Sequence, residues 1–298
     1  MFIRQLEYLV ALDRERHFGR AARACHVSQP TLSAGLRSLE RELGVPLVQR
    51  GREFKALTPE GKLIIGWAHR ALADLESLQQ EASRLRGGLE GTLRVGAIPT
   101  SLPLAPLVTE RFRERHPRMR MQWLAMNSHQ IARGLEQGEI DAGLTYLDND
   151  PIEHADVLPL WHEEYRLVVP ADTAFGESVT WAEAATLPLC LLTADMQHRR
   201  IVDSAFADAG VTPRAAVETN SVSTLVAHAR AGFPGITAHT WLEAHPLLSD
   251  LRAVPLVEPR IGHTIGLVVT TLIDRTPVLS ELMELFQPYA LDGRTSRA

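Results

Sequence analysis

The sequence predicts a mixed fold, in which an all-α winged helix-turn-helix domain with a long linker helix precedes an α/β domain. Three observations support this. A helical hairpin and a wing-like segment lie within residues 1–58, an unbroken helical pattern covers residues 59–88, and strands alternate with helices over residues 91–298. The length suits two or three domains, and 45% hydrophobic with 22% charged residues is typical of a globular protein.

Residues 18–43 contain two short helical patterns around a tight turn at residues 25–27. Ser28 is suited to cap the second helix, because its oxygen can accept a free backbone N–H near Thr31. Leucines at positions 32, 36, 39 and 43 form one buried face. The polar residues point elsewhere, as in a recognition helix that meets base edges in the major groove. The candidates for DNA contact here are Gln29, Pro30, Thr31, Ser33 and Arg37. The alternative is a plain helical hairpin that packs as core.

The segment 47–57 reads as a small hairpin, because short apolar pieces flank a glycine. Arg50 and Arg52 near its tip are placed to contact phosphates or a narrow minor groove. A solvated charged turn is the alternative for either arginine.

A new helix begins at Thr58-Pro59-Glu60, with a capping hydroxyl, a proline and an acid in its first turn, and should run to about Arg86. Its apolar residues repeat at spacings of four and three, which predicts a seam that pairs with a helix of a second subunit. The seam comprises Ile64, Ala68, Ala71, Leu75, Leu78, Ala82 and Leu85. Packing against its own DNA-binding domain is the alternative.

After residue 90, strand and helix patterns alternate, which predicts a parallel sheet with helices on its faces. The expected strands are 92–98, 119–125, 141–146, 165–169, 189–192, 215–218, 235–238 and 265–271, and the expected helices include 103–115, 128–136 and 277–287.

The net charge of −5 is unevenly distributed. Residues 1–90 hold 14 Lys and Arg against 11 Asp and Glu, whereas residues 91–298 hold 17 against 25. The basic end therefore suits DNA phosphates, and the acidic end does not.

The sequence predicts neither an enzyme nor a metal or cofactor protein. It lacks the common hydrolase, zinc-protease and phosphate-loop motifs, and its 12 histidines are scattered. Cys25 and Cys190 form no metal pattern and are expected to be buried. No apolar run is long enough to span a membrane and no signal peptide is apparent, so we expect a cytoplasmic protein.

The N-terminal part resembles LysR-type transcriptional regulators. The resemblance rests on Phe18, Ala21, Ala22, 27–33, 39–40, 42–47 and 57–61, and it continues through 91–96, Phe112, 116–117 and 135–145. Ala34 and Gly35 depart from the longer polar residues common in the family, which leaves the operator sequence open.

This resemblance implies a sequence-specific transcription factor with a two-lobed α/β effector-binding domain similar to periplasmic binding proteins. Lobe one would cover about 91–160 and 266–298, and lobe two about 161–265, joined by crossing strands near 158–163 and 261–268. The implied partners are promoter DNA with a palindromic site, a small-molecule effector, RNA polymerase and further copies of the chain, as a homodimer or homotetramer. The choice between activator and repressor stays open.

Ligands of open parallel sheets bind at the carboxyl ends of strands, against helix N-termini. Polar residues gather at such ends in both lobes, and the effector candidates are Thr100, Ser101, Asn127, Ser128, Thr145, Thr193, Gln197, His198, Arg199 and Thr237. Hydroxyls, free N–H groups and Arg199 together favour a small anion. The segment 195–200 is similar to that of members associated with one-carbon acid metabolism, which makes formate the first compound to test. Helix capping, structural histidines and a solvated arginine are the alternative roles.

Three other classes of protein share some of these features. A ligand-independent repressor would use the same DNA module. A solute-binding protein would explain residues 91–298 but neither the DNA module nor the missing signal peptide. A DNA-packaging protein would leave the effector domain without a role.

Overall fold

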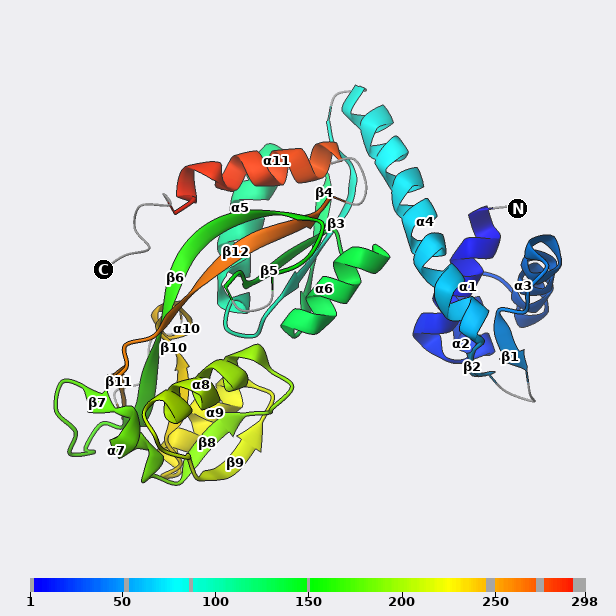
Figure 1. Cartoon of the computed structure of the whole chain (residues 1–298). Coiled ribbons are helices and arrows are strands. Elements are labelled where there is room, and N and C mark those ends of the chain that lie inside the picture. Colours follow the sequence, from blue (N-terminus) through cyan, green and yellow to red (C-terminus); the bar gives the residue numbers. More distant parts are fainter. Residues whose placement is uncertain are drawn as a thin grey trace. The chain divides into compact units, whose positions relative to one another are not determined.

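The computed structural model describes residues 3–50, 54–85, 88–148, 151–244, 250–271 and 276–291 (Figure 1). The chain divides into two compact units. The N-terminal unit comprises Met1–Gly91 with Gly134–Ile140, and the C-terminal unit comprises Thr92–Arg133 with Asp141–Ala298.

Helices α1 (Ile3–Glu15), α2 (Phe18–Ala24) and α3 (Gln29–Leu43) form a helix-turn-helix. The predicted cap of α3 is present, since Ser28 Oγ accepts the Thr31 N–H at 3.3 Å, and Gly44 ends the helix with a φ of 73°. The apolar faces of these helices meet in one core, whose fully buried leucines include Leu9, Leu12, Leu32, Leu36 and Leu39.

Gly35 has a packing reason that the sequence did not reveal. A Cβ atom at this position would lie 2.6 Å from the ring of Tyr8, which is buried on α1. The close approach of α1 and α3 therefore explains a glycine that costs up to about 1 kcal/mol of helix propensity.

The predicted wing is an antiparallel pair, β1 (Val48–Arg50) and β2 (Phe54–Leu57). Glu40 of α3 holds its first strand, because Glu40 Oε1 accepts the backbone N–H groups of Leu47 at 3.0 Å and Val48 at 3.2 Å. Thr58 caps the next helix by accepting the Gly61 N–H at 2.9 Å.

The long helix α4 (Pro59–Leu85) carries the expected seam, whose residues lie in two different environments. Ile64 and Ala68 pack against the core of the chain's own helix-turn-helix. Leu78 and Leu85, by contrast, are 69% and 76% exposed. The first part of the helix therefore packs against its own DNA-binding domain, and pairing of the exposed part with a second subunit stays a prediction.

The C-terminal unit is built on a ten-stranded sheet whose main path runs β4-β3-β5-β12-β6-β10-β8-β9. Lobe one contains the strands β3 (Gly91–Ala97), β4 (Met119–Ala125), β5 (Ala142–Tyr146), β12 (Gly262–Thr270) and the first part of β6 (Ala155–Pro170). Its helices are α5 (Ala105–Arg115), α6 (Ser128–Gln137) and α11 (Pro277–Phe286), with short 3₁₀ turns at Leu102–Leu104 and Gln287–Tyr289.

Lobe two contains the second part of β6 with β7 (Val179–Thr180), β8 (Leu189–Leu192), β9 (Ala215–Thr219), β10 (Gly235–Ala238) and β11 (Leu251–Val257). Its helices are α7 (Trp181–Ala185), α8 (Gln197–Asp208), α9 (Val222–Arg230) and α10 (His239–Ala244). A core cluster that includes Val168, Cys190, Leu225 and Ala229 packs its sheet against α9.

The strands β6 and β12 join the two lobes (Figure 1). They pair antiparallel from Gly262↔Glu164 to Thr270↔Ala155, close to the crossing segments that the resemblance implied. The expectation of a parallel sheet therefore holds for only part of the strand pairs. The pairs β3–β5, β10–β8 and β8–β9 are parallel. The crossing strands β6 and β12 are antiparallel to each other, and they pair antiparallel with β10 and β5, respectively.

Candidate functional site

The exposed face of α3 carries the predicted DNA-contact residues. Leu32, Leu36 and Leu39 face the core, but Leu43, expected on the same buried face, is 37% exposed at the end of the helix. The side chains of Gln29, Pro30, Thr31 and Arg37 are exposed and Ser33 is half-buried. The Thr31 hydroxyl lies 2.8 Å from Ser28 Oγ, so the cap also orients it. Amide, hydroxyl and guanidinium groups on this face are of the kinds that can form hydrogen bonds to base edges, so the predicted contacts remain predictions.

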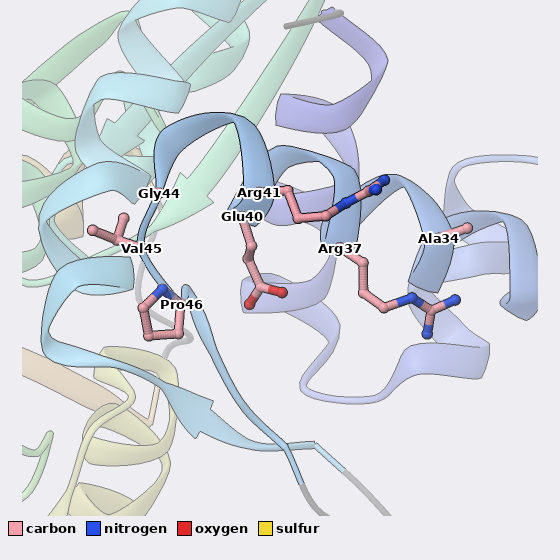
Figure 2. Close-up of a pocket in the computed structure, with 7 residues that line it drawn as sticks. All are labelled: Ala34, Arg37, Glu40, Arg41, Gly44, Val45 and Pro46. Atoms are coloured by element: carbon pink, nitrogen blue, oxygen red, sulfur yellow. The ribbon is translucent and has the colours of Figure 1, made fainter.

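A shallow groove beside α3 is lined by Arg41, a cation that was not among the residues predicted to contact DNA. Figure 2 shows Arg37 and Arg41 one turn apart on this helix, with both side chains extended along it. The groove is lined by Ala34, Arg37, Glu40, Arg41, Gly44, Val45 and Pro46. The four-residue spacing of the two arginines was the available signal, because it places both on one helix face.

The two predicted arginines of the wing, Arg50 and Arg52, differ from those of α3 in that their side chains are not described. Arg52 and the Arg50 side chain lie outside the described residues, so their predicted contacts remain predictions. Lys55 on β2 is exposed.

The structure brings several predicted effector residues together around one pocket in the C-terminal unit. Its lining comes from the ends of β3, β5 and β8 and from the N-terminal ends of α6 and α8. The lining residues are Ile98, Pro99, Thr100, Asn127, Ser128, Tyr146, Leu192, Met196, Gln197 and His198. The Asn127 amide donates to Asp195 Oδ2 at 3.3 Å, which links the two lobes beside the pocket.

Most of the remaining candidates are buried and lie outside the lining. Thr145 donates a hydrogen bond to Ser128 Oγ at 3.0 Å. Ser101 and Thr237 are each 1% exposed, and the Thr193 N–H donates to the Thr219 carbonyl at 3.0 Å.

Buried polar atoms without hydrogen-bond partners are concentrated at this site. Among the described residues they include Ser101 Oγ, Thr237 Oγ1, both amide atoms of Gln197 and both ring nitrogens of His198. Thr100 Oγ1 also lacks a partner of normal hydrogen-bond geometry, although its hydroxyl lies close enough to Glu163 to favour that acid's charged form. Buried polar groups are nearly always paired in native proteins. The unpartnered atoms of Gln197 and His198, which line the pocket, are therefore available to a polar ligand.

Arg199 does not belong to this pocket. Its guanidinium binds the Leu192 carbonyl at 2.8 Å, Glu218 Oε1 at 2.6 Å and Asp203 Oδ1 at 2.8 Å. These contacts occupy the Nε and Nη1 donors, and Arg199 is not among the residues that line the pocket. The pocket lining contains no lysine or arginine.

A buried polar cluster behind the pocket was not predicted from the sequence, and it contains Glu163, Tyr146, Tyr165 and His263. Glu163 is fully buried, and its Oε1 accepts a hydrogen bond from the Tyr146 hydroxyl at 2.7 Å. The Tyr165 hydroxyl lies 3.4 Å from His263 Nδ1, and its ring makes an edge contact with His198. The alternation of residues 161, 163 and 165 on one face of β6 was the available signal.

Burial displaces the pKa values of these groups in opposite directions. Loss of solvation raises the pKa of Glu163 to about 7, although the hydroxyls of Tyr146 and Thr100 favour the carboxylate. Burial, with a smaller effect of His263, lowers the pKa of His198 to about 3. Near pH 7 the histidine is therefore neutral, whereas the acid is close to its midpoint.

Two other kinds of site are absent from the described residues. No group of three or more His, Cys, Asp or Glu residues among them could hold a metal ion. None of their helices is long and apolar enough to cross a membrane.

A helix-turn-helix with an exposed polar recognition face, joined to a two-lobed domain with an interlobe pocket, defines a DNA-binding regulator that responds to a ligand. Family models agree. The model of the bacterial regulatory helix-turn-helix protein, lysR family, matches residues 3–62, and that of the LysR substrate binding domain matches residues 86–290. The chain belongs to the LysR family of DNA-binding transcription regulators.

Two curated relatives illustrate the match. The DNA-binding transcriptional dual regulator OxyR of Escherichia coli (strain K12) is 33% identical over 273 residues, which cover 90% of this chain and 89% of that protein. A hydrogen peroxide-inducible genes activator of Haemophilus influenzae is 30% identical over 285 residues, covering 90% of each.

Solved structures share the fold. A full-length OxyR variant from Pseudomonas aeruginosa has a TM-score of 0.77 at 27% identity and covers 97% of this chain and 96% of that one. CbnR in complex with its target DNA has a TM-score of 0.70, covering 97% of this chain and 100% of that one, and at 23% identity it shows the fold alone.

Proposed function

We propose that this regulator binds promoter DNA through α3 and the wing, and that a small anion in the interlobe pocket controls it. The observation that carries the proposal is the set of buried, unpartnered polar atoms from both lobes, above all those of Gln197 and His198. A ligand that satisfies donors from both lobes favours one arrangement of the lobes, which is the condition for a ligand to shift a conformational equilibrium.

The pocket supports an anion of few atoms. In this conformation the cavity has room for about one water molecule, which excludes aromatic acids. The N-terminal ends of α6 and α8, both in the lining, provide free backbone N–H groups and a partial positive charge. Neutral donors and helix ends would thus replace the arginine expected from the sequence.

The names of several relatives make peroxide a second candidate signal. This chain has two cysteines, and peroxide reacts with an accessible thiolate. Cys190 is fully buried as expected, whereas Cys25 is half-buried. Burial raises the pKa of both thiols. These residues therefore disfavour a thiol-based peroxide response, and we place peroxide second.

We also propose that the protein acts in the cytoplasm as a homodimer or homotetramer. The exposed leucines of α4, Leu78 and Leu85, support pairing of this helix with a second copy. A twofold assembly would recognise a palindromic site.

Calorimetric titration tests the effector site. Formate, acetate, chloride and hydrogen peroxide are titrated into the wild type and into Thr100→Val, which keeps the side-chain shape but removes a hydroxyl. We expect an anion to bind the wild type and to bind the variant about tenfold or more weakly, as for a lost hydrogen bond of about 1–3 kcal/mol.

Thr212→Val is the matched control, because Thr212 is exposed in a loop outside the pocket lining. The control should bind like the wild type, and both variants should keep the DNA affinity of the ligand-free protein. Equal anion affinity in Thr100→Val and wild type would reject this site, and binding of peroxide alone would reject the anion.

A further inference from the structure

Glu163 is a buried acid that lies directly behind the pocket wall. It is 0% exposed, and only its Oε1 is hydrogen-bonded, to the Tyr146 hydroxyl, while Oε2 has no partner among the described residues. Tyr146 and Thr100, the two hydroxyl residues that act on this carboxyl, both line the pocket. A change at Glu163 can therefore reach a bound ligand through one side chain.

Within the described part of the chain, no lysine or arginine acts on the Glu163 carboxyl. The titratable groups of this cluster are Tyr146 on β5, Tyr165 on β6, His263 on β12, His198 on α8 and Asp148 after β5. Burial raises the pKa of both tyrosines and lowers the pKa of both histidines, so these four are neutral at pH 7. The Asp148 carboxyl and the imidazole of His162, the neighbour of Glu163 on β6, also act on the cluster, both through His263.

We propose that the pocket takes up one proton with each anion, that Glu163 carries this proton, and that Tyr146 transmits the change to the ligand. The inference rests on the proposed function, because it assigns a regulation to the same pocket. It makes acidity a second input to the regulator.

The hydrogen bond between Glu163 and Tyr146 provides the mechanism. When Glu163 is ionised, the Tyr146 hydroxyl donates to it and offers the pocket only an oxygen lone pair, while the carboxylate repels an anion. When a proton from solvent binds Glu163, the new O–H can donate to the Tyr146 oxygen. The Tyr146 hydrogen is then free to donate to the anion, so protonation converts a repulsive wall into a donor.

The pH range follows from linkage. In the free protein the pKa of Glu163 is about 7, because burial outweighs its hydrogen bonds, and a neighbouring anion raises this pKa further. Below about pH 6 the acid is already protonated, and binding takes up little. Above pH 7 proton uptake approaches one per anion, and affinity falls by up to about tenfold per pH unit.

Calorimetry with sodium formate, acetate and chloride as probes tests this. These anions do not change charge between pH 6 and 9, so a change in affinity belongs to the protein. Titrations at pH 8 in two buffers of different ionisation enthalpy measure the protons taken up. We expect about one proton per anion at pH 8 and close to none at pH 6.

Glu163→Gln mimics the protonated acid, since its amide can donate to Tyr146. This variant should bind the anion with little pH dependence and without proton uptake. Glu164→Gln is the matched control, because Glu164 is the next residue on the same strand and its exposed side chain pairs with Arg166. It should keep the wild-type proton uptake and pH dependence.

Three outcomes overturn the inference. Binding without proton uptake in the wild type, or uptake that persists in Glu163→Gln, rejects it while the anion site stands. Binding of none of the three anions at any pH rejects both proposals. If Glu163→Gln does not fold, carboxyl infrared titration of the wild type decides, because formate must raise the midpoint of the buried acid.

Discussion

Replacing Gly35 by alanine tests how α3 is held for DNA recognition, because two effects of opposite sign meet there. Alanine stabilises a helix interior by about 0.8–1 kcal/mol relative to glycine. The new Cβ would, however, lie 2.6 Å and 2.7 Å from two carbons of the Tyr8 ring, and overpacking of this kind costs about 1–3 kcal/mol. We expect the contact to prevail, with a net loss of about 1 kcal/mol in the stability of α3.

A double-mutant cycle separates the two effects. In a Tyr8→Val background the ring carbons are absent, so Gly35→Ala should stabilise α3 by about 1 kcal/mol. Hydrogen exchange of the α3 amides in the full chain measures both values, since it reports local stability. DNA affinity should fall for Gly35→Ala alone, because α3 must shift from Tyr8. A single variant that is more stable than wild type and binds DNA normally would refute this account of the glycine.

The other predictions concern DNA reading, pairing and pH. Gln29→Ala should cost about 1–3 kcal/mol of binding free energy on a DNA site selected by the wild type, and it should reduce the preference between bases in anisotropy titrations. Arg41→Ala should weaken binding to all DNA sequences alike and lower the slope of log affinity against log salt concentration by about 1. The reverse pattern would exchange these two roles. Leu78→Asp should reduce self-association in sedimentation experiments, because Leu78 is 69% exposed in the single chain, while Gln79→Asp adds the same charge beside the seam as a control. Unchanged sedimentation of Leu78→Asp would reject α4 as the pairing helix. In the wild type, the contributions of Glu163 and His198 to the unfolding free energy of the C-terminal unit change in opposite directions between pH 4.5 and 6.5 and cancel. In Glu163→Gln only the His198 contribution remains, so the unfolding free energy should rise with pH over this range. A variant with the wild-type pH profile would show that Glu163 does not titrate in this range.

Local signals carried most of the fold prediction. The cap at Ser28, the start of α4 at Pro59 and the bounds of β4, β8 and β10 agree with the structure, because each depends on short-range chemistry. The length of β6 was underestimated, since its first part carries charged residues that weaken a strand signal. The division of the α4 seam could not be predicted, because spacing alone does not distinguish a partner helix from the chain's own core.

The site was predictable where topology decides it. Strand ends converge in any open parallel arrangement, which is why Thr100, Asn127, Ser128, Gln197 and His198 lie around one pocket. Arg199 shows the limit of this reasoning. Asp203 lies one helical turn away and was visible in the sequence, but Glu218 comes from β9, and only the tertiary structure brings it to the guanidinium.

Glu163 and His198 shift the stability of the C-terminal unit in opposite directions. The pKa of Glu163 rises from its ordinary 4.5 to about 7, so its contribution is fully present below pH 4.5 and is lost as pH rises to 7. The pKa of His198 falls from 6.5 to about 3, so its contribution is present above pH 6.5 and is lost as pH falls to 3. Between pH 4.5 and 6.5 the two slopes oppose each other. An apolar residue at position 163 would remove the penalty of a buried acid at neutral pH, and a fold selected for stability alone has no need of this carboxyl. Its place behind the ligand pocket therefore favours a role in ligand binding, since departures from the most stable arrangement are concentrated at functional sites.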